Sequence, residues 1–186
     1  YMDWPKPLIE LEVAAYRELI RQRGVDRVPV ARLVGEKDFY GRKLIVAPGA
    51  FVPRPETEGV VERALALLAT DPGLQVPRPV VFEVGTGSGC IITTLAAENP
   101  TPRYLASDVS DEALGVARRN AARLHVAERV DFRHGAYFAD FEGAIHLVVS
   151  NPPYIATGEI AGLPPEVSVH DPRAALDGGA GAAAGA

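Results

Sequence analysis

Cysteine and long apolar runs are scarce in this sequence. It contains one cysteine, Cys90, and no stretch near the about 20 apolar residues that a membrane-spanning helix needs. A single cysteine excludes an internal disulfide, and we expect Cys90, at a helix start, to pack and not to react. No secretory signal opens the sequence. We therefore expect a cytoplasmic protein.

The sequence also lacks a basic excess and a metal-binding pattern. It has 186 residues, with 19 basic against 24 acidic side chains and a net charge of −5, so no global positive field attracts nucleic acid. A local basic patch stays compatible with this balance. The four histidines show no metal-ligand spacing, so we predict no metal. The length suits one domain with a substantial core and a small appendage.

The segment Asn151-Pro152-Pro153-Tyr154 follows an apolar run, residues 145–150, that predicts a buried strand. The carboxyl ends of strands are where open α/β sheets bind their ligands. Asn151 offers an amide oxygen, and the prolines hold a rigid backbone whose carbonyls have no competing N–H groups. Two such acceptors can hold both N–H bonds of a planar NH2 group and favour its attack. The alternative is a proline-rich turn.

A second strand, residues 80–84, leads into the glycine-rich segment 85–89 and then into an apolar helix. The third glycine of the dinucleotide fingerprint would fall on Cys90, which disfavours NAD and FAD, and the loop has no Walker lysine. Glycines let a backbone approach a ligand closely, and the helix N-terminus offers free N–H donors. Ordinary turn formation is the alternative.

The run 103–107 predicts the next strand, which ends at Asp108, 19 residues after Gly89. An acidic residue near this spacing binds ribose hydroxyls in nucleotide-binding folds. Ser110 is a typical N-cap for the following helix. The inner face of that helix is expected to carry Leu114, Ala117, Ala121 and Leu124. Alternatively, Asp108 only marks the helix entry.

These motifs together resemble class I S-adenosylmethionine-dependent methyltransferases that act on planar nitrogen. Residues 51–58, Phe-Val-Pro-Arg-Pro-Glu-Thr-Glu, preceded by residues 35–41, resemble the signature segment of the PrmC/HemK family. Residues 163–167 and 171–179 continue the resemblance, which covers roughly residues 7 to 179. Members of that family are protein-(glutamine-N5) methyltransferases that modify class I peptide chain release factors.

The resemblance implies S-adenosyl-L-methionine as cofactor and a set of site residues. The cofactor-binding residues it implies are Glu83, Gly85, Thr86, Gly87, Ser88, Gly89, Asp108, Tyr137 and Asn151. The catalytic residues it implies are Asn151, Pro152, Pro153 and Tyr154. The sequence departs from the family at Ala136, where an acidic residue is usual, and this leaves Tyr137 as the aromatic expected near the adenine. A core position is the alternative for Tyr137.

The expected fold class is α/β, a Rossmann-like class I methyltransferase sheet with flanking helices. Strands expected at Val80, Arg103, Val130 and Ile145 alternate with helices or loops, which predicts parallel βαβ units. Right-handed crossovers and the family's strand order place the first and fourth strands side by side. The family continues with three further strands, so we expect the chain to be incomplete at its C-terminus, where residues 180–186 are alanine and glycine only.

Three parts are expected along the chain. Residues 1–34 are expected to be the remnant of a helical N-terminal substrate-binding domain, with a helix over residues 7–23. Its apolar stripe is Leu8, Leu11, Ala15 and Leu19. Residues 35–55 are expected to form a β-hairpin linker. Residues 56–186 are expected to form the methyltransferase domain, opening with a helix over residues 56–69.

The implied reaction moves a methyl group to the side-chain amide nitrogen of the glutamine in the Gly-Gly-Gln loop of a class I release factor. Asn151 and the Pro152 carbonyl would hold the amide hydrogens, Pro153 would set the loop geometry, and Tyr154 would pack on the amide plane. Neither a stable nucleic-acid partner nor a membrane is expected. Two alternatives stay open: methylation of the exocyclic amine of adenine or cytosine in DNA or RNA, and a non-catalytic cofactor-binding subunit.

Overall fold

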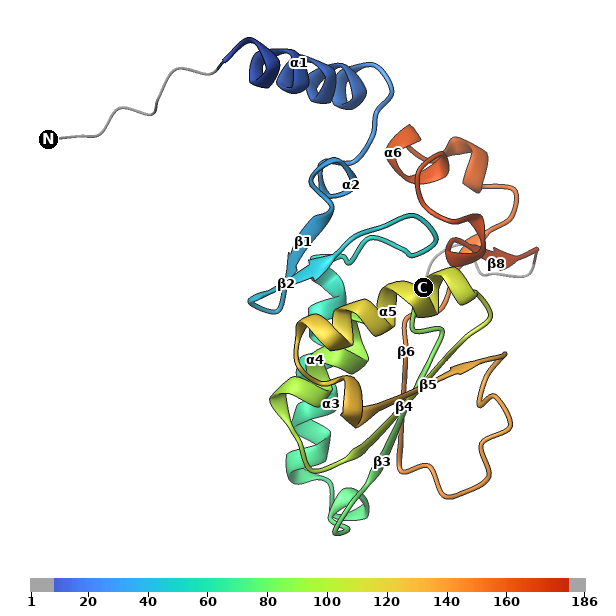
Figure 1. Cartoon of the computed structure of the whole chain (residues 1–186). Helices are drawn as coiled ribbons and strands as arrows, with labels where there is room; N and C mark the ends of the chain where they lie inside the picture. Colours follow the sequence, from blue (N-terminus) through green and yellow to red (C-terminus); the bar gives the residue numbers. More distant parts are fainter. Residues whose placement is uncertain (1–8, 181–186) are drawn as a thin grey trace, which may run out of the picture.

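The computed structural model describes residues 9–180 and shows a helix-backed sheet with a hairpin and an N-terminal helix beyond it (Figure 1). The α-helices of this part of the chain are α1 Glu10–Gly24, α2 Val30–Val34, α3 Glu58–Thr70, α4 Cys90–Glu98, α5 Asp111–Arg123 and α6 Pro165–Ser168. Its strands are β1 Glu36–Phe39, β2 Arg42–Ile45, β3 Val80–Val84, β4 Arg103–Asp108, β5 Val130–His134, β6 Leu147–Ser150, β7 Ile155–Ala156 and β8 Asp177–Gly179. Its 3-10 turns are η1 Pro55–Thr57, η2 Pro72–Leu74, η3 Ala127–Arg129, η4 Ile160–Gly162 and η5 Arg173–Ala175. The expected helix start at Pro7 and Leu8 and the alanine and glycine residues from position 181 onward lie outside the described residues.

The central sheet is parallel throughout and has the order β5-β4-β3-β6. The predicted α/β class and the predicted neighbourhood of the first and fourth strands are therefore confirmed. The chain runs outward from β3 through β4 to β5 and then returns to place β6 on the other side of β3. This reversal creates a switch point between β3 and β6, where the loops at the carboxyl ends of two neighbouring strands diverge.

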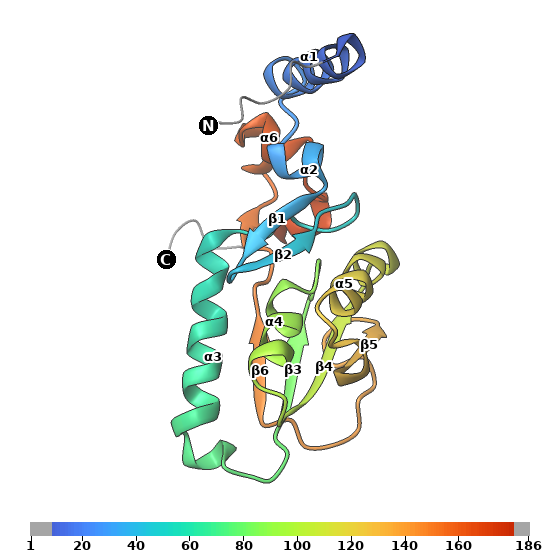
Figure 2. The same ribbon diagram turned by 60° about the vertical axis from the view of Figure 1, so that its left-hand side comes forward.

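The helices α3, α4 and α5 form one layer against one face of the sheet (Figure 2). α3 starts two residues later than the sequence predicts, because η1 occupies residues 55–57 and Pro55 lies at its start. α5 begins as predicted, with the Ser110 hydroxyl accepting a hydrogen bond from the Ala113 N–H at 3.2 Å. Leu114, Ala117 and Ala121 are buried on its inner face, and Leu124, just past its end, is half-buried.

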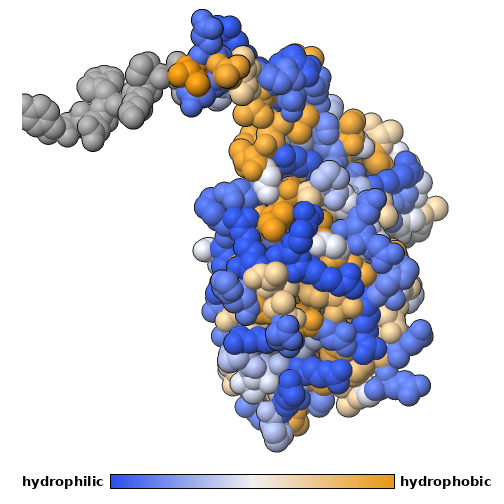
Figure 3. Space-filling view, in the orientation of Figure 1, coloured by the Kyte–Doolittle hydropathy of each residue, from blue (hydrophilic) through white to orange (hydrophobic). Residues whose placement is uncertain are grey.

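The predicted hairpin is formed by β1 and β2, which pair antiparallel across a two-residue turn at Tyr40 and Gly41. Both turn residues have positive φ, 50° and 69°, as a tight hairpin turn requires. Beyond the hairpin, α1 buries none of its residues and exposes Leu11 and Ile20. Figure 3 shows hydrophobic side chains gathered on this face at α1 and at the segment that joins it to α2. None of the helices in the described residues could cross a bilayer.

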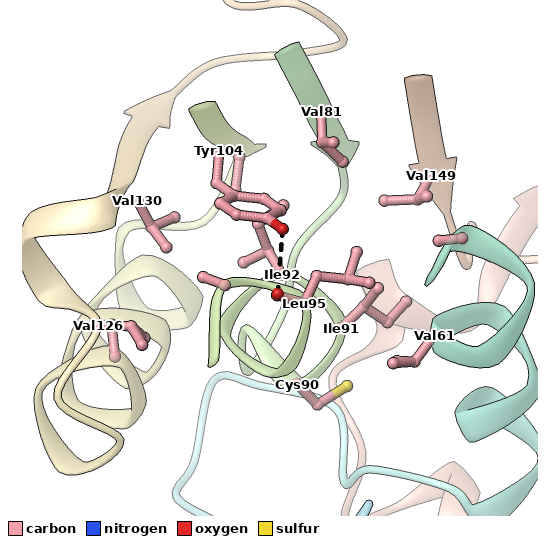
Figure 4. Close-up of a cluster of buried hydrophobic side chains, with 14 of the residues drawn as sticks. Val61, Val81, Cys90, Ile91, Ile92, Leu95, Tyr104, Val126, Val130 and Val149 are labelled. Atoms are coloured by element: carbon pink, nitrogen blue, oxygen red, sulfur yellow. Dashed lines mark hydrogen bonds between the residues drawn. The ribbon is translucent and has the colours of Figure 1, made fainter. Parts of the chain in front are cut away.

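The core lies between the sheet and the helix layer (Figure 4). Val81 and Val149 point from the sheet toward Ile91 and Leu95 of α4. Each aliphatic side chain buried in this way stabilises the fold by about 1.5–3 kcal/mol. Tyr104 is also fully buried, and its hydroxyl donates to the carbonyls of Leu95 and Asn99 at 3.0 and 2.7 Å. The one polar atom of this aromatic side chain is thus satisfied.

The opposite face of the sheet is covered only in part. The buried Phe82 ring meets Phe138 edge-on, with centroids 5.4 Å apart, so the loop after β5 shields this point. On the same face, Val148 of β6, the register partner of Phe82, is 48% exposed. The strand expected over residues 145–150 is therefore present, but it is shorter than predicted and only partly buried. β6 is an edge strand among the described residues, and it begins at Leu147.

The late start of β6 has a local cause at His146. The Val80 N–H, which a regular ladder would pair with a backbone carbonyl, donates instead to the His146 ring nitrogen Nδ1 at 3.0 Å. The His146 N–H donates to the Val80 carbonyl at 2.9 Å. A side chain thus replaces one backbone acceptor at the first rung of the ladder.

Candidate active site

The glycine loop and the Asn-Pro-Pro-Tyr segment leave the sheet at the same point. Val84 and Ser150, the last residues of β3 and β6, are paired in register, and the Ser150 hydroxyl donates to the Val84 carbonyl at 2.8 Å. The next residue is Gly85 in one strand and Asn151 in the other. Two-substrate transfer requires its two binding loops to face each other, and this pairing provides that arrangement.

The glycine loop has an open side and a packed side. Gly85 and Gly87 have φ of 71° and 54°, and a Cβ added to either would meet no atom within 4 Å. Gly89 has φ of 76°, but there a Cβ would lie 2.9 Å from the Ala117 Cβ of α5. The first two glycines therefore leave backbone accessible to a ligand, and the third lets the loop pack against a helix. This cradle fits a cofactor such as S-adenosylmethionine.

Asp108 lies at the carboxyl end of β4 and braces the glycine loop. Its Oδ2 accepts a hydrogen bond from the Gly87 N–H at 2.8 Å, and its Oδ1 accepts one from the Ser110 N–H at 3.0 Å. A carboxylate oxygen has more than one acceptor site, so both oxygens retain capacity for ribose hydroxyls. Asp108 therefore holds the glycine loop in place, a contact that the sequence spacing does not show.

Glu83 lies beneath the loop and not on its open side. The side chain is 1% exposed, and its Oε2 accepts from the Thr86 hydroxyl at 2.5 Å and from the Ile92 N–H at 3.2 Å. Burial raises the pKa of the Glu83 carboxyl to about 8, and the two hydrogen bonds oppose this shift only in part. Glu83 therefore does not line the open side of the glycine loop, and it acts there only by holding Thr86 of the loop in place.

Asn151 is anchored through its nitrogen. Its Nδ2 donates to the Thr57 hydroxyl oxygen at 3.3 Å, and its Oδ1 has no hydrogen-bond donor among the residues that the structure describes. Pro152, Pro153 and Tyr154 are exposed, Tyr154 at 72%. The exposed Asn-Pro-Pro-Tyr segment therefore leaves the sheet beside the glycine loop, and the catalytic roles of its four residues stay a prediction.

A buried ionic cluster of Asp171, Arg32 and Arg54 holds together segments next to the candidate site, and the sequence analysis does not predict it. The Asp171 side chain is fully buried and pairs with Arg32 at 2.8 Å and Arg54 at 2.7 Å. Arg32 also donates to the carbonyls of Ala47 and Ala50 at 3.1 and 3.0 Å. The cluster therefore fixes residues 51–58, which contain Thr57, against residues 171–179. Arg54 and Asp171 lie in two of the segments that carry the family resemblance, residues 51–58 and 171–179, but no sequence pattern pairs them.

Tyr137 is an exposed residue of the loop that follows β5. The Tyr137 side chain is 75% exposed, on a segment tied to β4 by a hydrogen bond from the Ser107 hydroxyl to the Tyr137 carbonyl. This excludes a core position and places Tyr137 in a loop beside the end of β4, next to Asp108.

Cys90 is buried, and burial raises the pKa of its thiol to about 12. The thiol therefore stays protonated and packs, as predicted.

Comparison with known proteins identifies the class. The described chain has the architecture of a class I S-adenosylmethionine-dependent methyltransferase, with a cofactor-type glycine loop at the switch point of a parallel sheet. The sequence profile of the methyltransferase small domain matches residues 59–177. The chain belongs to that family. In fold alone it is similar to the hMettl16 catalytic domain solved in complex with MAT2A 3'UTR hairpin 6, with a TM-score of 0.58 and 15% identity over 91% of this chain and 58% of that one.

Relatives with closer sequences share one name. The chain is 42% identical over 175 residues to the release factor glutamine methyltransferase of Cereibacter sphaeroides and 45% identical over 181 residues to that of Chlorobaculum tepidum. These matches cover 94% and 95% of this chain but 59% and 61% of the relatives. A human relative, the MTRF1L release factor glutamine methyltransferase, is 36% identical over 188 residues and is covered to 54%. The chain thus spans little more than half the length of these relatives.

Proposed function

We propose that the protein transfers the methyl group of S-adenosylmethionine to the side-chain amide nitrogen of the glutamine in the Gly-Gly-Gln loop of a class I peptide chain release factor. The observation that carries the proposal is the 42–45% identity to release factor glutamine methyltransferases over nearly the whole chain. The Asn-Pro-Pro-Tyr segment beside an open glycine loop supports it with a site of matching chemistry.

The cofactor would lie on the open side of the glycine loop. Gly85 and Gly87 would face it with bare backbone, and Asp108 would accept hydrogen bonds from the ribose hydroxyls. Tyr137 would flank the adenine, since its exposed ring follows β5 next to the end of β4. When bound, the cofactor supplies the electrophilic sulfonium methyl group.

The glutamine side chain would enter beside Tyr154. Its amide nitrogen is a poor nucleophile while the lone pair is delocalised into the carbonyl. The Asn151 Oδ1 and the Pro152 carbonyl would each accept one of the two N–H bonds, which fixes the nitrogen and favours its pyramidal form. Held in this way, the nitrogen lone pair would be free to accept the methyl group that the cofactor supplies, and the surplus proton would leave to water.

The remaining parts of the chain suit a protein substrate. The exposed apolar side chains of α1 and the hairpin between α1 and the sheet support assigning residues 1–34 to a substrate-binding remnant, 35–55 to a linker and 56–186 to the catalytic domain. A release factor works in translation, so we place the proposed activity in the cytoplasm. The net charge of −5 does not favour a nucleic-acid substrate.

The proposal is tested with the protein expressed at its full natural length and labelled cofactor. A class I release factor should gain one methyl group on the Gly-Gly-Gln glutamine, measured by mass spectrometry. A substrate with that glutamine changed to asparagine should fail, because the nitrogen is withdrawn by about 1 Å, a misplacement that can cost ~100-fold in rate. Label in DNA or RNA and none in release factor would replace the glutamine proposal with the nucleic-acid alternative.

The enzyme variant Asn151→Ala separates catalysis from cofactor binding. Loss of a positioned transition-state hydrogen-bond partner costs on the order of 100- to 1000-fold in rate. Affinity for S-adenosylhomocysteine should stay within about tenfold of wild type. Turnover near the wild-type rate would show that Asn151 is only a turn residue, and methylation by neither protein would support the non-catalytic alternative.

A further inference from the structure

Asn120 of α5 is a fully buried polar side chain outside the residues discussed so far. Its Oδ1 accepts a hydrogen bond from the Ile45 N–H at 2.7 Å. Its Nδ2 donates to the Ile45 carbonyl at 3.2 Å and to the Ser88 carbonyl at 2.9 Å. The carboxamide thus contacts β2 of the hairpin and the glycine loop at once. No other side chain of this size offers one acceptor and two donors in this arrangement.

The contact at Ile45 follows from the hairpin register. Ile45 lies opposite Glu36, and the next residue, Val46, donates to the Gly35 carbonyl at 2.9 Å. In an antiparallel pair, hydrogen-bonded and non-hydrogen-bonded positions alternate, so the N–H and C=O of Ile45 point away from β1. The Asn120 carboxamide satisfies both groups and takes the place of a neighbouring strand.

The contact at Ser88 lies on the packed side of the glycine loop. Ser88 is buried between Gly87 and Gly89, and Gly89 packs directly on Ala117, one turn before Asn120 on α5. The Ser88 carbonyl is therefore held toward α5, while the Gly85 and Gly87 side of the loop stays open. Movement of the loop at Ser88 would break its hydrogen bond to the Asn120 carboxamide, the same group that holds the hairpin at Ile45.

We propose that Asn120 is a positioning residue that couples the hairpin to the cofactor-binding glycine loop, so that cofactor binding and hairpin position depend on each other. The coupling rests on the proposed cofactor site but not on the identity of the methylated substrate. It has a structural consequence: the hairpin, which connects the substrate-side helices to the sheet, is held most firmly when the cofactor orders the loop.

Hydrogen exchange with and without S-adenosylhomocysteine tests the coupling in the full-length protein. In wild type, the ligand should slow exchange of the Ile45 amide by at least about fivefold, the lower end of ordinary coupling between sites. In Asn120→Ala, that added protection should vanish, and the affinity for S-adenosylhomocysteine should fall about 5- to 10-fold, as expected for loss of one buried hydrogen bond to the loop.

The control is Asn99→Ala, which removes a carboxamide whose Oδ1 accepts a hydrogen bond from the Thr101 N–H, outside the hairpin and the glycine loop, and should leave the Ile45 response unchanged. Full ligand protection of Ile45 in Asn120→Ala would overturn the proposal, as would a wild-type protein whose Ile45 amide does not respond to bound ligand. Should Asn120→Ala fail to fold, the wild-type measurement decides alone. Failure to methylate a release factor would leave these binding and exchange results intact, so the two proposals fail separately.

Discussion

The Asn151 amide nitrogen lies 3.3 Å from the Thr57 hydroxyl oxygen, and this contact fixes which end of the amide points away from Thr57. With Nδ2 directed at Thr57, the Oδ1 acceptor is left for the incoming N–H group. Thr57 is itself buried, in the segment that Asp171 holds through Arg54. The signature segment 51–58 therefore orients Asn151, the proposed catalytic residue, through the Thr57 side chain.

Replacing Thr57 tests this orientation. Thr57→Val keeps the shape but removes the hydroxyl acceptor, so Asn151 can turn its nitrogen toward the substrate. We expect turnover to fall about 10- to 100-fold, in the range that small misplacements cost, with S-adenosylhomocysteine affinity unchanged in calorimetry. Thr57→Ser, which keeps the hydroxyl, should recover most of the rate. Equal turnover in the valine and serine variants would exclude the orienting role.

Asp108 should be required for the cofactor and not for nicotinamide nucleotides. Asp108→Ala removes the proposed ribose acceptors and the brace on Gly87. We expect S-adenosylhomocysteine binding to weaken by roughly 1.5 to 3 kcal/mol, the range for hydrogen bonds to a charged group. Asp108→Asn, which keeps one oxygen acceptor, should lose less. Titration calorimetry measures both variants. Unchanged affinity would remove Asp108 from the site, and NAD binding by wild type would refute the cofactor assignment.

Asp171 should be worth far more stability than a surface carboxylate. Its side chain is fully buried between two arginines, so Asp171→Ala leaves the largely buried Arg32 guanidinium without its counter-charge. Breaking a buried pair in this way costs about 3–5 kcal/mol. Urea unfolding should show this loss, whereas Asp38→Ala, at a side chain 77% exposed, should change stability by less than about 0.5 kcal/mol. A small effect of Asp171→Ala would mean that solvent reaches the cluster.

Local patterns predict the strands, the glycine loop and the position of Asn151, because each depends on neighbours within a few residues. The contacts that support the site, in contrast, join residues that are far apart in the sequence. Asn151 and Thr57 are 94 residues apart in sequence, Asn120 and Ile45 are 75 apart, and Arg32 and Asp171 are 139 apart. Such pairs leave no periodic signal.

Glu83 should make stability depend on pH in a direction opposite to ordinary surface carboxylates. Burial raises its pKa from 4.5 to about 8, so between these values the unfolded chain is ionised while the folded protein keeps its proton. The contribution of this group to stability is therefore fully present below about pH 4.5 and is lost as pH rises through about 8. The loss is at most about 1.4 kcal/mol per pH unit.

Glu83→Gln tests this, because the glutamine side chain cannot ionise. Between about pH 5 and pH 8, the free energy of unfolding of Glu83→Gln, measured with urea, should rise relative to that of wild type by up to this amount per pH unit. Glu62→Gln, at an exposed position of α3, should run parallel to wild type. Parallel curves for wild type and Glu83→Gln would instead show that the buried carboxyl titrates near its ordinary pKa.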